Sequence, residues 1–320
     1  MAVPDAKEKW SGAINTVTLG ATAEQGGTRG KTVTVGGATG IPFLEMDGAT
    51  PNPPVIAVDV VDIEPETWAA PLAEAYGDVW GDPAAWAKRA AEVGADLISL
   101  RLDGVHPESK DRSADEAVET VKAILGAVDL PLIVWGCDVP DKDQKVMPKV
   151  AEAAKGESCL LGAVTETEYR TLTAAAQAYG HKIIALSPID INKQKQVNIL
   201  VSDMGFSVEN IVMYPTTAGL GYGMEYVYSI LERGRLAALG GDTLMAQPII
   251  LDVGAEAWRA KEAKAGDEFV EAWGAVKERG IAWEVTTATN LLQGGADILT
   301  MRHPDAIAAV RKSITTLVSA

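Results

Sequence analysis

The sequence contains few residues that bind metals through sulfur or imidazole. In 320 residues there are only two cysteines, Cys137 and Cys159, and three histidines, His106, His181 and His303. An iron–sulfur cluster usually takes about four cysteines, and no His or Cys pair has the short spacing of a zinc site. We therefore expect no metal site on this chain. Two isolated cysteines also form no disulfide framework, which favours a reducing compartment.

Positive charge and long apolar runs are also scarce. The chain has 28 Lys and Arg residues against 44 Asp and Glu residues, which gives a formal net charge of −16. Such a surface repels phosphate backbones and anionic lipids, so we expect no nucleic-acid or membrane partner, although acidity by itself can serve only solubility. Residues 1–10 are charged rather than apolar, unlike a signal peptide. No apolar run approaches the ~18 residues of a membrane span, which predicts a cytoplasmic protein.

Short apolar, β-branched segments recur from Pro54 onward, each followed by a loop and an amphipathic helical pattern. They lack strict alternation, as expected for parallel strands covered on both faces. Repeated β–α units most economically close into a (β/α)8 TIM barrel, an α/β fold, and a doubly wound open sheet is the alternative. We expect the strands at Val55–Val60, Asp96–Leu102, Leu132–Cys137, Cys159–Val164, Ile183–Leu186, Ile211–Tyr214, Ile249–Asp252 and Ile298–Met301.

Two segments fall outside this repeat. Residues 16–19 and 32–35 alternate between polar and apolar side chains around a glycine-rich connection, which predicts a β-hairpin at the amino-terminal mouth of the barrel. We therefore divide the chain into an extension with the hairpin, residues 1–52, and the TIM barrel, residues 53–320. The long segment before the eighth strand predicts extra helices at Asp267–Gly280, with Phe269, Val270, Trp273 and Val276 facing inward, and at Trp283–Leu292.

The carboxyl ends of the strands form the working face of such a barrel. Asp and Glu are plentiful there, which allows acid–base chemistry, but acidic residues also cap the helices that follow strands. These positions offer no Schiff-base lysine and no Ser-His-Asp arrangement, so we assign no catalytic residue. The most unusual stretch is Tyr214–Gly223 after the sixth strand, where Gly219, Gly221 and Gly223 would let the backbone approach a ligand closely.

Several longer segments resemble one protein family. They are the hairpin TVTLGAT…RGKTVTVGGATG (16–40) and the stretches GADLISLRLDGVHP (94–107), PLIVWGCDVPDKD (131–143), YPTTAGLGYGMEYVYSILERGRLAALGGD (214–242), QPIILDVGAEAWRAKEA (247–263) and WEVTTATNLLQGGADILTMRHP (283–304). The chain resembles the small subunit of the corrinoid/iron–sulfur protein, whose archaeal relative is the delta subunit of the acetyl-CoA decarbonylase/synthase complex. The resemblance covers nearly the whole chain.

The resemblance implies a heterodimer with a large subunit that holds an iron–sulfur cluster and a cobalamin-binding domain. This pair carries a methyl group on cobalt from methyltetrahydrofolate methyltransferase to carbon monoxide dehydrogenase/acetyl-CoA synthase, in the reductive acetyl-CoA pathway. A cobamide would lie between the large subunit and the carboxyl face of this barrel. The scarcity of cysteine and the missing Asp-x-His-x-x-Gly cobalamin motif agree with this division of labour.

With this resemblance, we expect the loop after the sixth strand to contact the corrin edge. Its backbone amides, threonine hydroxyls and one aromatic ring are the groups suited to that contact. The predicted loop contacts are Thr216, Thr217, Gly219, Leu220, Gly221 and Tyr222, and the weaker rim candidates are Asp138, Ser187, Asp252 and Gly254.

Two other functions compete with this hypothesis. One is a free-standing barrel methyltransferase that binds a pterin on the same face, with Asp59, Asp103, Asn192 and Asn290 as its candidates. Binding of methyltetrahydrofolate by the chain alone would favour it. The other is a purely structural subunit, which an exposed apolar ring without polar ligand contacts would favour.

Overall fold

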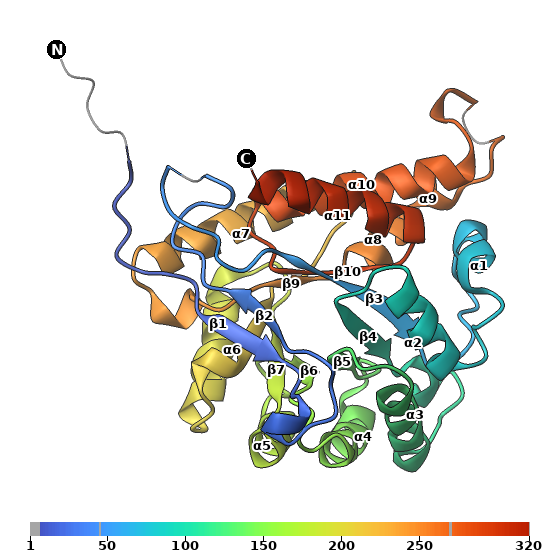
Figure 1. The fold of residues 1–320 in the computed structure, drawn as a ribbon, viewed down its shortest axis with the longest axis horizontal. Coiled ribbons are helices and arrows are strands. Elements are labelled where there is room, and N and C mark those ends of the chain that lie inside the picture. The colour runs from blue at the N-terminus through green and yellow to red at the C-terminus, as the bar shows by residue number, and fades with distance from the viewer. Residues whose placement is uncertain (1–6, 45, 269–270, 320) are drawn as a thin grey trace.

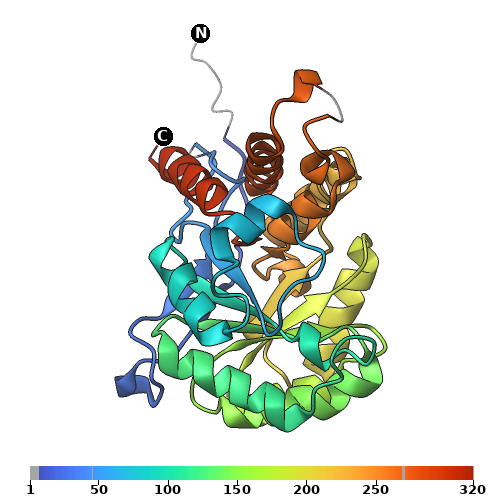
Figure 2. The same ribbon diagram turned by 90° about the vertical axis from the view of Figure 1, so that its right-hand side faces the viewer.

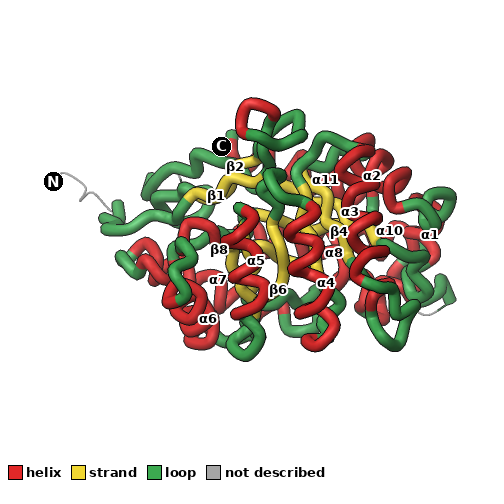
Figure 3. Tube along the Cα trace, turned by 90° about the horizontal axis from the view of Figure 1, so that it is seen from below, coloured by secondary structure: helices red, strands yellow, loops and turns green. Residues whose placement is uncertain are grey.

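Eight parallel strands form a closed barrel surrounded by helices (Figures 1 and 3). The computed structural model describes residues 7–44, 46–268 and 271–319. Within the sheet the strands follow the order β8-β7-β6-β5-β4-β3-β10-β9, and a parallel bridge between Met213 and Ile249 joins the two ends. The strands are β3 (Val55–Val61), β4 (Leu97–Arg101), β5 (Leu132–Trp135), β6 (Leu160–Val164), β7 (Lys182–Leu186), β8 (Ile211–Tyr214), β9 (Ile250–Leu251) and β10 (Ile298–Met301).

The ring closure confirms the predicted TIM barrel, and the alternative of an open sheet is wrong. The helices are α1 (Ala70–Tyr76), α2 (Pro83–Glu92), α3 (Ala114–Ala127), α4 (Pro140–Ala153), α5 (Arg170–Tyr179), α6 (Ile191–Asp203), α7 (Met224–Leu239), α8 (Val253–Arg259), α9 (Lys261–Lys264), α10 (Val276–Gln293) and α11 (Pro304–Val318). Their starts follow local chemistry. Asp82 caps α2 by accepting from the amides of Ala84 and Ala85, and Ser113 forms a capping box with Glu116 at α3.

The amino-terminal hairpin closes one mouth of the barrel. Strands β1 (Thr16–Leu19) and β2 (Val33–Gly36) pair antiparallel, beside the barrel strands in Figure 3. Their inward side chains form one buried cluster with residues near the starts of the barrel strands: Val17, Leu19, Val33 and Val35 pack with Ala57, Leu97, Ile133, Leu160, Ile184, Val212, Ile250 and Ile298. The hairpin therefore seals the amino-terminal mouth, and the carboxyl mouth is the open one. The division of the chain at residue 52 stays a prediction.

The extra helix before the last strand is confirmed, but its bounds differ from the prediction. The predicted helix Trp283–Leu292 lies inside α10. A helix over Asp267–Gly280 is wrong, because Gly274 has a φ of 73° and only a short 3-10 turn, η5 (Glu271–Trp273), precedes it. Trp273 is 44% exposed instead of facing inward, and η5 lies away from the barrel strands in Figures 1 and 2. The predicted inward residues Phe269 and Val270 lie outside the described residues.

Candidate functional site at the carboxyl mouth

A cavity of about 810 Å³ opens at the carboxyl ends of the strands. Its floor is made of residues at or beyond the ends of β4, β5, β6, β8 and β9, namely Arg101, Trp135, Gly162, Tyr214 and Asp252. Its rim is made of the loops before α4, α5 and α6 together with the first turns of these helices. This volume falls in the range of small-molecule sites, ~300–1,000 Å³.

Four charged side chains from four strands form one cluster at this floor, of which Arg101 and Asp252 line the cavity and Asp59 and Arg302 do not. Asp59 Oδ2 lies 3.0 Å from Arg101 Nε and 2.9 Å from Arg302 Nε, and Arg101 Nη2 lies 2.7 Å from Asp252 Oδ2. Asp59 is fully buried. Burial opposes its ionisation, but the two guanidinium groups hold the pKa of Asp59 below its ordinary value. This cluster therefore carries two fixed positive and two fixed negative charges.

Aromatic rings complete the floor. Trp135 donates its indole N–H to Ser99 Oγ at 3.0 Å, and its ring meets Tyr214 edge-on with centroids 5.5 Å apart. The guanidinium carbon of Arg101 lies 5.4 Å from the Trp135 centroid. Burial raises the pKa of the Tyr214 phenol, so Tyr214 stays neutral at physiological pH. The cavity thus combines rigid aromatic surface with a fixed charge array.

The structure brings four predicted site residues to the cavity wall: Asp138, Ser187, Thr216 and Asp252. Asp252 is held by both carboxylate oxygens, since Thr300 Oγ1 donates to Oδ1 at 2.8 Å and Arg101 pairs with Oδ2. Thr216, with a φ of 73°, donates its hydroxyl to the carbonyl of Ser187 at 3.1 Å. Side-chain bonds therefore join the end of β8 to the end of β7, and the end of β9 to β10 and β4.

The remaining predicted loop residues do not line this cavity. The Thr217 hydroxyl accepts from the Asp252 amide at 2.7 Å. The Leu220 amide donates to Thr287 Oγ1 at 3.3 Å, and the Leu220 carbonyl accepts from Trp283 Nε1 at 3.1 Å. The backbone amide and carbonyl of Leu220 therefore bond to side chains of α10, a contact that the sequence did not indicate.

The glycines of the loop and Tyr222 have separate structural roles. A Cβ on Gly219 would lie 3.0 Å from the Glu256 carbonyl, and Gly221 has a φ of 78°. Tyr222 is 47% exposed and donates its hydroxyl to Glu262 at 2.6 Å. The fourth rim candidate, Gly254, packs against β10, because a Cβ there would lie 2.7 Å from Cγ of Arg302. None of these residues lines the cavity.

Several lining residues were not selected from the sequence. Arg101, Trp135, Glu166, Arg170 and Lys193 all line the cavity. Arg101 and Glu166 stand at strand ends, which is the one signal that could have selected them. Arg170 and Lys193 lie on helices, and only the tertiary structure turns them toward the mouth.

The residues considered for a pterin site are not gathered here. Asp59 is engaged by two arginines. Asn192 is exposed on α6, and Asn290 donates its side-chain amide to the carbonyl of Thr286 within α10. Asp103 follows β4 in a 3-10 turn. None of the four lines the cavity.

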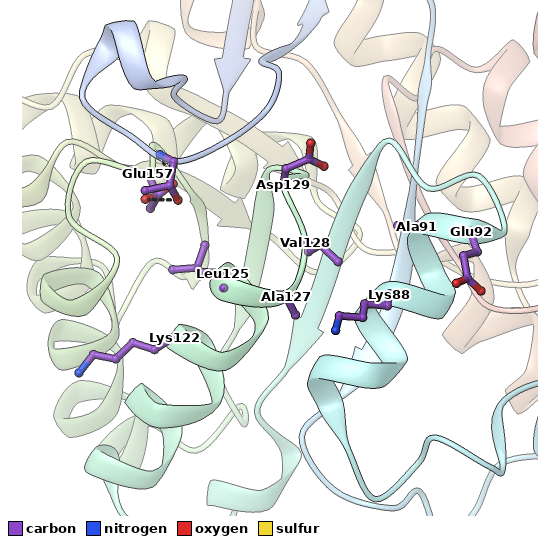
Figure 4. A pocket seen from close by; sticks show the side chains of 11 residues that line it. Lys88, Ala91, Glu92, Lys122, Leu125, Ala127, Val128, Asp129 and Glu157 are labelled. Carbon is purple, nitrogen blue, oxygen red and sulfur yellow. Dashed lines mark hydrogen bonds between the residues drawn. The ribbon is translucent and has the colours of Figure 1, made fainter.

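A second depression, of about 900 Å³, lies outside the barrel at the carboxyl ends of α2 and α3 (Figure 4). Its charged side chains Lys88, Glu92 and Lys122 are exposed and extend in different directions in Figure 4. Glu157 at its edge is turned to Arg29, with Arg29 Nε 2.7 Å from Glu157 Oε2. Its polar groups do not converge on a common point, so we do not assign a site there.

The described residues show neither a metal-binding cluster nor a membrane-spanning helix. The residues that the structure describes contain no group of three or more His, Cys, Asp and Glu side chains suited to a metal ion. Both cysteines are buried and unpaired. Across the described residues, no helix has the length and apolar character needed to span a membrane.

Residues 16–315 match the family described as CO dehydrogenase/acetyl-CoA synthase delta subunit. The chain belongs to this family. An acetyl-CoA decarbonylase/synthase complex subunit delta of Archaeoglobus fulgidus is 39% identical over 317 residues, which cover 97% of this chain and 70% of the relative. The corresponding subunit of Methanopyrus kandleri is 38% identical over 305 residues, covering 95% and 75%. The resemblance noted in the sequence is thereby confirmed for the archaeal delta subunit.

Solved structures similar to this delta-subunit family member support the barrel architecture. Dihydropteroate synthase of Xanthomonas albilineans aligns with a TM-score of 0.55 at 16% identity, covering 84% of this chain and 93% of the other. The enzyme of Thermus thermophilus aligns with a TM-score of 0.53, also at 16% identity, covering 83% and 94%. At this identity the likeness establishes the fold and no shared ligand.

Proposed function

We propose that this delta-subunit family member is the small subunit of a heterodimeric corrinoid/iron–sulfur methyl carrier. The pair would move a methyl group on cobalt from methyltetrahydrofolate methyltransferase to acetyl-CoA synthase in the reductive acetyl-CoA pathway. The family match over residues 16–315 is the observation that carries the proposal.

The open carboxyl mouth is the proposed seat of the cobamide, between this barrel and the large subunit. A bound cobamide would supply the cobalt that carries the methyl group. The wall of the cavity offers hydrogen-bond donors and acceptors to a corrin edge, and none of its lining residues is histidine. We therefore assign this chain the tasks of holding the corrin edge and excluding water, which protects a strongly reduced metal, while the partner domain moves.

Exposed apolar side chains near the same mouth support a partner surface there. Tyr222 and Tyr226 are 47% and 62% exposed at the start of α7, and Ile189 is 48% exposed just before α6. Large apolar side chains in one area are typical of protein interfaces. The loop residues Thr216, Thr217, Gly219, Leu220, Gly221 and Tyr222, with Asp138, Ser187, Asp252 and Gly254, stay the proposed contacts to the cobamide.

An absorption spectrum tests the proposal directly. The chain is purified alone and after co-expression with a candidate large subunit in a corrinoid-producing host. We expect corrinoid and iron–sulfur absorption only in a stable one-to-one complex. A colourless chain that assembles with no large subunit, yet binds methyltetrahydrofolate, would contradict the proposal and favour a free-standing methyltransferase.

A matched pair of variants on α7 tests where the large subunit docks. Tyr226→Ser removes an exposed ring near the carboxyl mouth, and Leu236→Ser removes a side chain that is 48% exposed near the opposite end of the same helix. We expect Tyr226→Ser to weaken assembly about tenfold or more, as the loss of a central interface aromatic does. Leu236→Ser should assemble like the wild type. Equal effects of the two changes would place the interface elsewhere.

A further inference from the structure

The side chain of Arg101 is fixed with one edge left for a ligand. Its Nε is 3.0 Å from Asp59 Oδ2 and its Nη2 is 2.7 Å from Asp252 Oδ2. The guanidinium is planar with five N–H donors, so these two carboxylates hold it in one orientation. Nε and Nη2 are buried and face these two carboxylates, while the side chain as a whole is 16% exposed and lines the cavity. Nη1 is therefore the donor that the floor offers to a bound molecule.

The cavity also offers acceptors to a molecule bound at Arg101. Asp138 and Glu166 line the cavity with carboxylates, which accept hydrogen bonds when ionised. Thr216 also lines it, and its single hydroxyl proton is donated to the carbonyl of Ser187. A carbonyl oxygen can only accept, so the Thr216 hydroxyl has only its lone pairs left for a ligand. A molecule in this cavity thus meets a fixed donor below and acceptors at its sides, with the exposed cations Arg170 and Lys193 on the rim.

This arrangement selects between three kinds of ligand group. A carboxylate could accept from Arg101, but Asp138, Glu166 and Asp252 would repel it. An ammonium group suits those acids but is repelled by Arg101 at the floor. A neutral amide edge satisfies both, because its C=O accepts from Nη1 and its adjacent N–H groups donate to the walls.

We infer that the carboxyl cavity recognises an amide edge, with its carbonyl on Arg101 and its N–H groups on the surrounding acceptors. Two molecules of the proposed function carry such an edge. A corrin ring bears primary carboxamides on its side chains, and a pterin has a lactam edge with an adjacent amino group. The inference rests on the proposed function where it names the corrin carboxamide.

Nuclear magnetic resonance titration of the isolated chain with two small probes tests the site itself. Propionamide has the amide edge, and propionate has nearly the same shape without N–H donors. We expect saturable shifts of backbone amide signals near Arg101, Thr216 and Asp252 with propionamide, and at least about tenfold weaker binding of propionate. Equal binding of the two probes, or shifts only at other positions, would overturn the inference. This comparison uses the wild-type chain and needs no variant to fold.

A pair of variants assigns the donor. Arg101→Lys keeps the positive charge but loses the second edge, and we expect about fivefold to tenfold weaker propionamide binding. Lys149→Met is the matched control, because it removes an exposed cation of α4 that does not line the cavity. It should bind propionamide within about twofold of the wild type. Retained affinity in a folded Arg101→Lys variant would exclude Arg101 as the donor.

Two further arms identify the source of the amide edge. In the heterodimer, corrinoid retention is compared between cobalamin and cobalamin whose propionamides are hydrolysed to carboxylates. For the isolated chain, displacement of propionamide by tetrahydrofolate is measured. Weaker retention of the hydrolysed corrinoid assigns the site to the corrin, and displacement by micromolar tetrahydrofolate assigns it to a pterin.

The outcomes also separate the inference from the proposed function. Propionamide binding without any corrinoid-containing heterodimer would keep the amide-edge site and refute the methyl carrier. A coloured heterodimer whose chain does not distinguish propionamide from propionate would keep the methyl carrier and refute the amide-edge site.

Discussion

Replacement of Asp59 by Asn isolates the contribution of one buried charge to the candidate site. Asp59 Oδ2 contacts both Arg101 and Arg302, while Oδ1 has no hydrogen-bond partner. An Asn side chain can therefore place its oxygen where Oδ2 lies and its NH2 group where no donor opposes it. The shape and the acceptor are kept, and only the negative charge is lost.

The expected loss of stability in Asp59→Asn depends on the contacts that Arg101 and Arg302 keep. Arg101 keeps its ion pair with Asp252, but Arg302 has no second ion pair among the described residues and keeps the face of Trp68, 4.2 Å from its guanidinium carbon. Breaking a buried pair costs about 3–5 kcal/mol, and the kept hydrogen-bond acceptor reduces this cost. We expect Asp59→Asn to lower the free energy of unfolding by about 3 kcal/mol at pH 7.

Urea unfolding followed by circular dichroism measures this difference. Asp78→Asn is the matched control, because Asp78 pairs with Arg89 at 3.0 Å but its side chain is 63% exposed. That change should cost less than about 0.5 kcal/mol. If Asp59→Asn costs no more than the control, the buried charge array does not stabilise the barrel mouth.

The pH dependence gives a second check on Asp59. Arg101 and Arg302 depress the pKa of Asp59 despite its burial, so its charge stabilises the fold fully above the unfolded pKa of about 4. This stabilisation is lost as pH falls through the lower folded pKa. The wild type and Asp59→Asn should therefore differ at neutral pH and converge in strong acid.

Three further changes test other parts of the structure. Arg29→Met should lower the free energy of unfolding in urea by about 3–5 kcal/mol, because buried Arg29 binds Glu157 and the carbonyls of Leu125 and Val128. Lys122→Met, on the exposed surface of α3, is the control and should cost less than about 0.5 kcal/mol. Burial raises the pKa of Glu284 to about 7, so the wild type should lose stability as pH rises from about 4.5 to about 7, and Glu284→Gln should remove that slope in unfolding measured across this range. Gly221→Val forces a branched residue to a φ of 78° and should reduce corrinoid content of the purified heterodimer while the isolated barrel stays folded; normal content would separate the loop from the cofactor.

The strands and the hairpin were predictable because their burial pattern is local. Parallel strands covered on both faces are continuously apolar, and the segments chosen on that basis contain all eight barrel strands to within a few residues. The structure of the region before the last strand could not be predicted in this way, because Gly274 and its neighbours break a helix that the apolar spacing indicates. There the backbone conformation of one glycine overrides the pattern.

For the candidate site, only the face of the barrel on which it lies could be predicted from the sequence. Strand-end positions pointed to the carboxyl mouth, where Asp138, Ser187, Thr216 and Asp252 do line the cavity. The loop glycines drew attention by their number, but Gly219 serves close packing against α8. A glycine pattern alone does not tell close approach to a ligand from close approach to the protein's own backbone.

The barrel and the family could be inferred from the sequence, because strand burial and motif identity are properties of local segments. The tertiary structure alone decided the charged floor. Arg302 reaches Asp59 from 243 residues away, and Arg101 meets both Asp59 and Asp252 only where three strand ends converge. Ion pairs form between whichever side chains ring closure brings together, and no local pattern encodes that meeting.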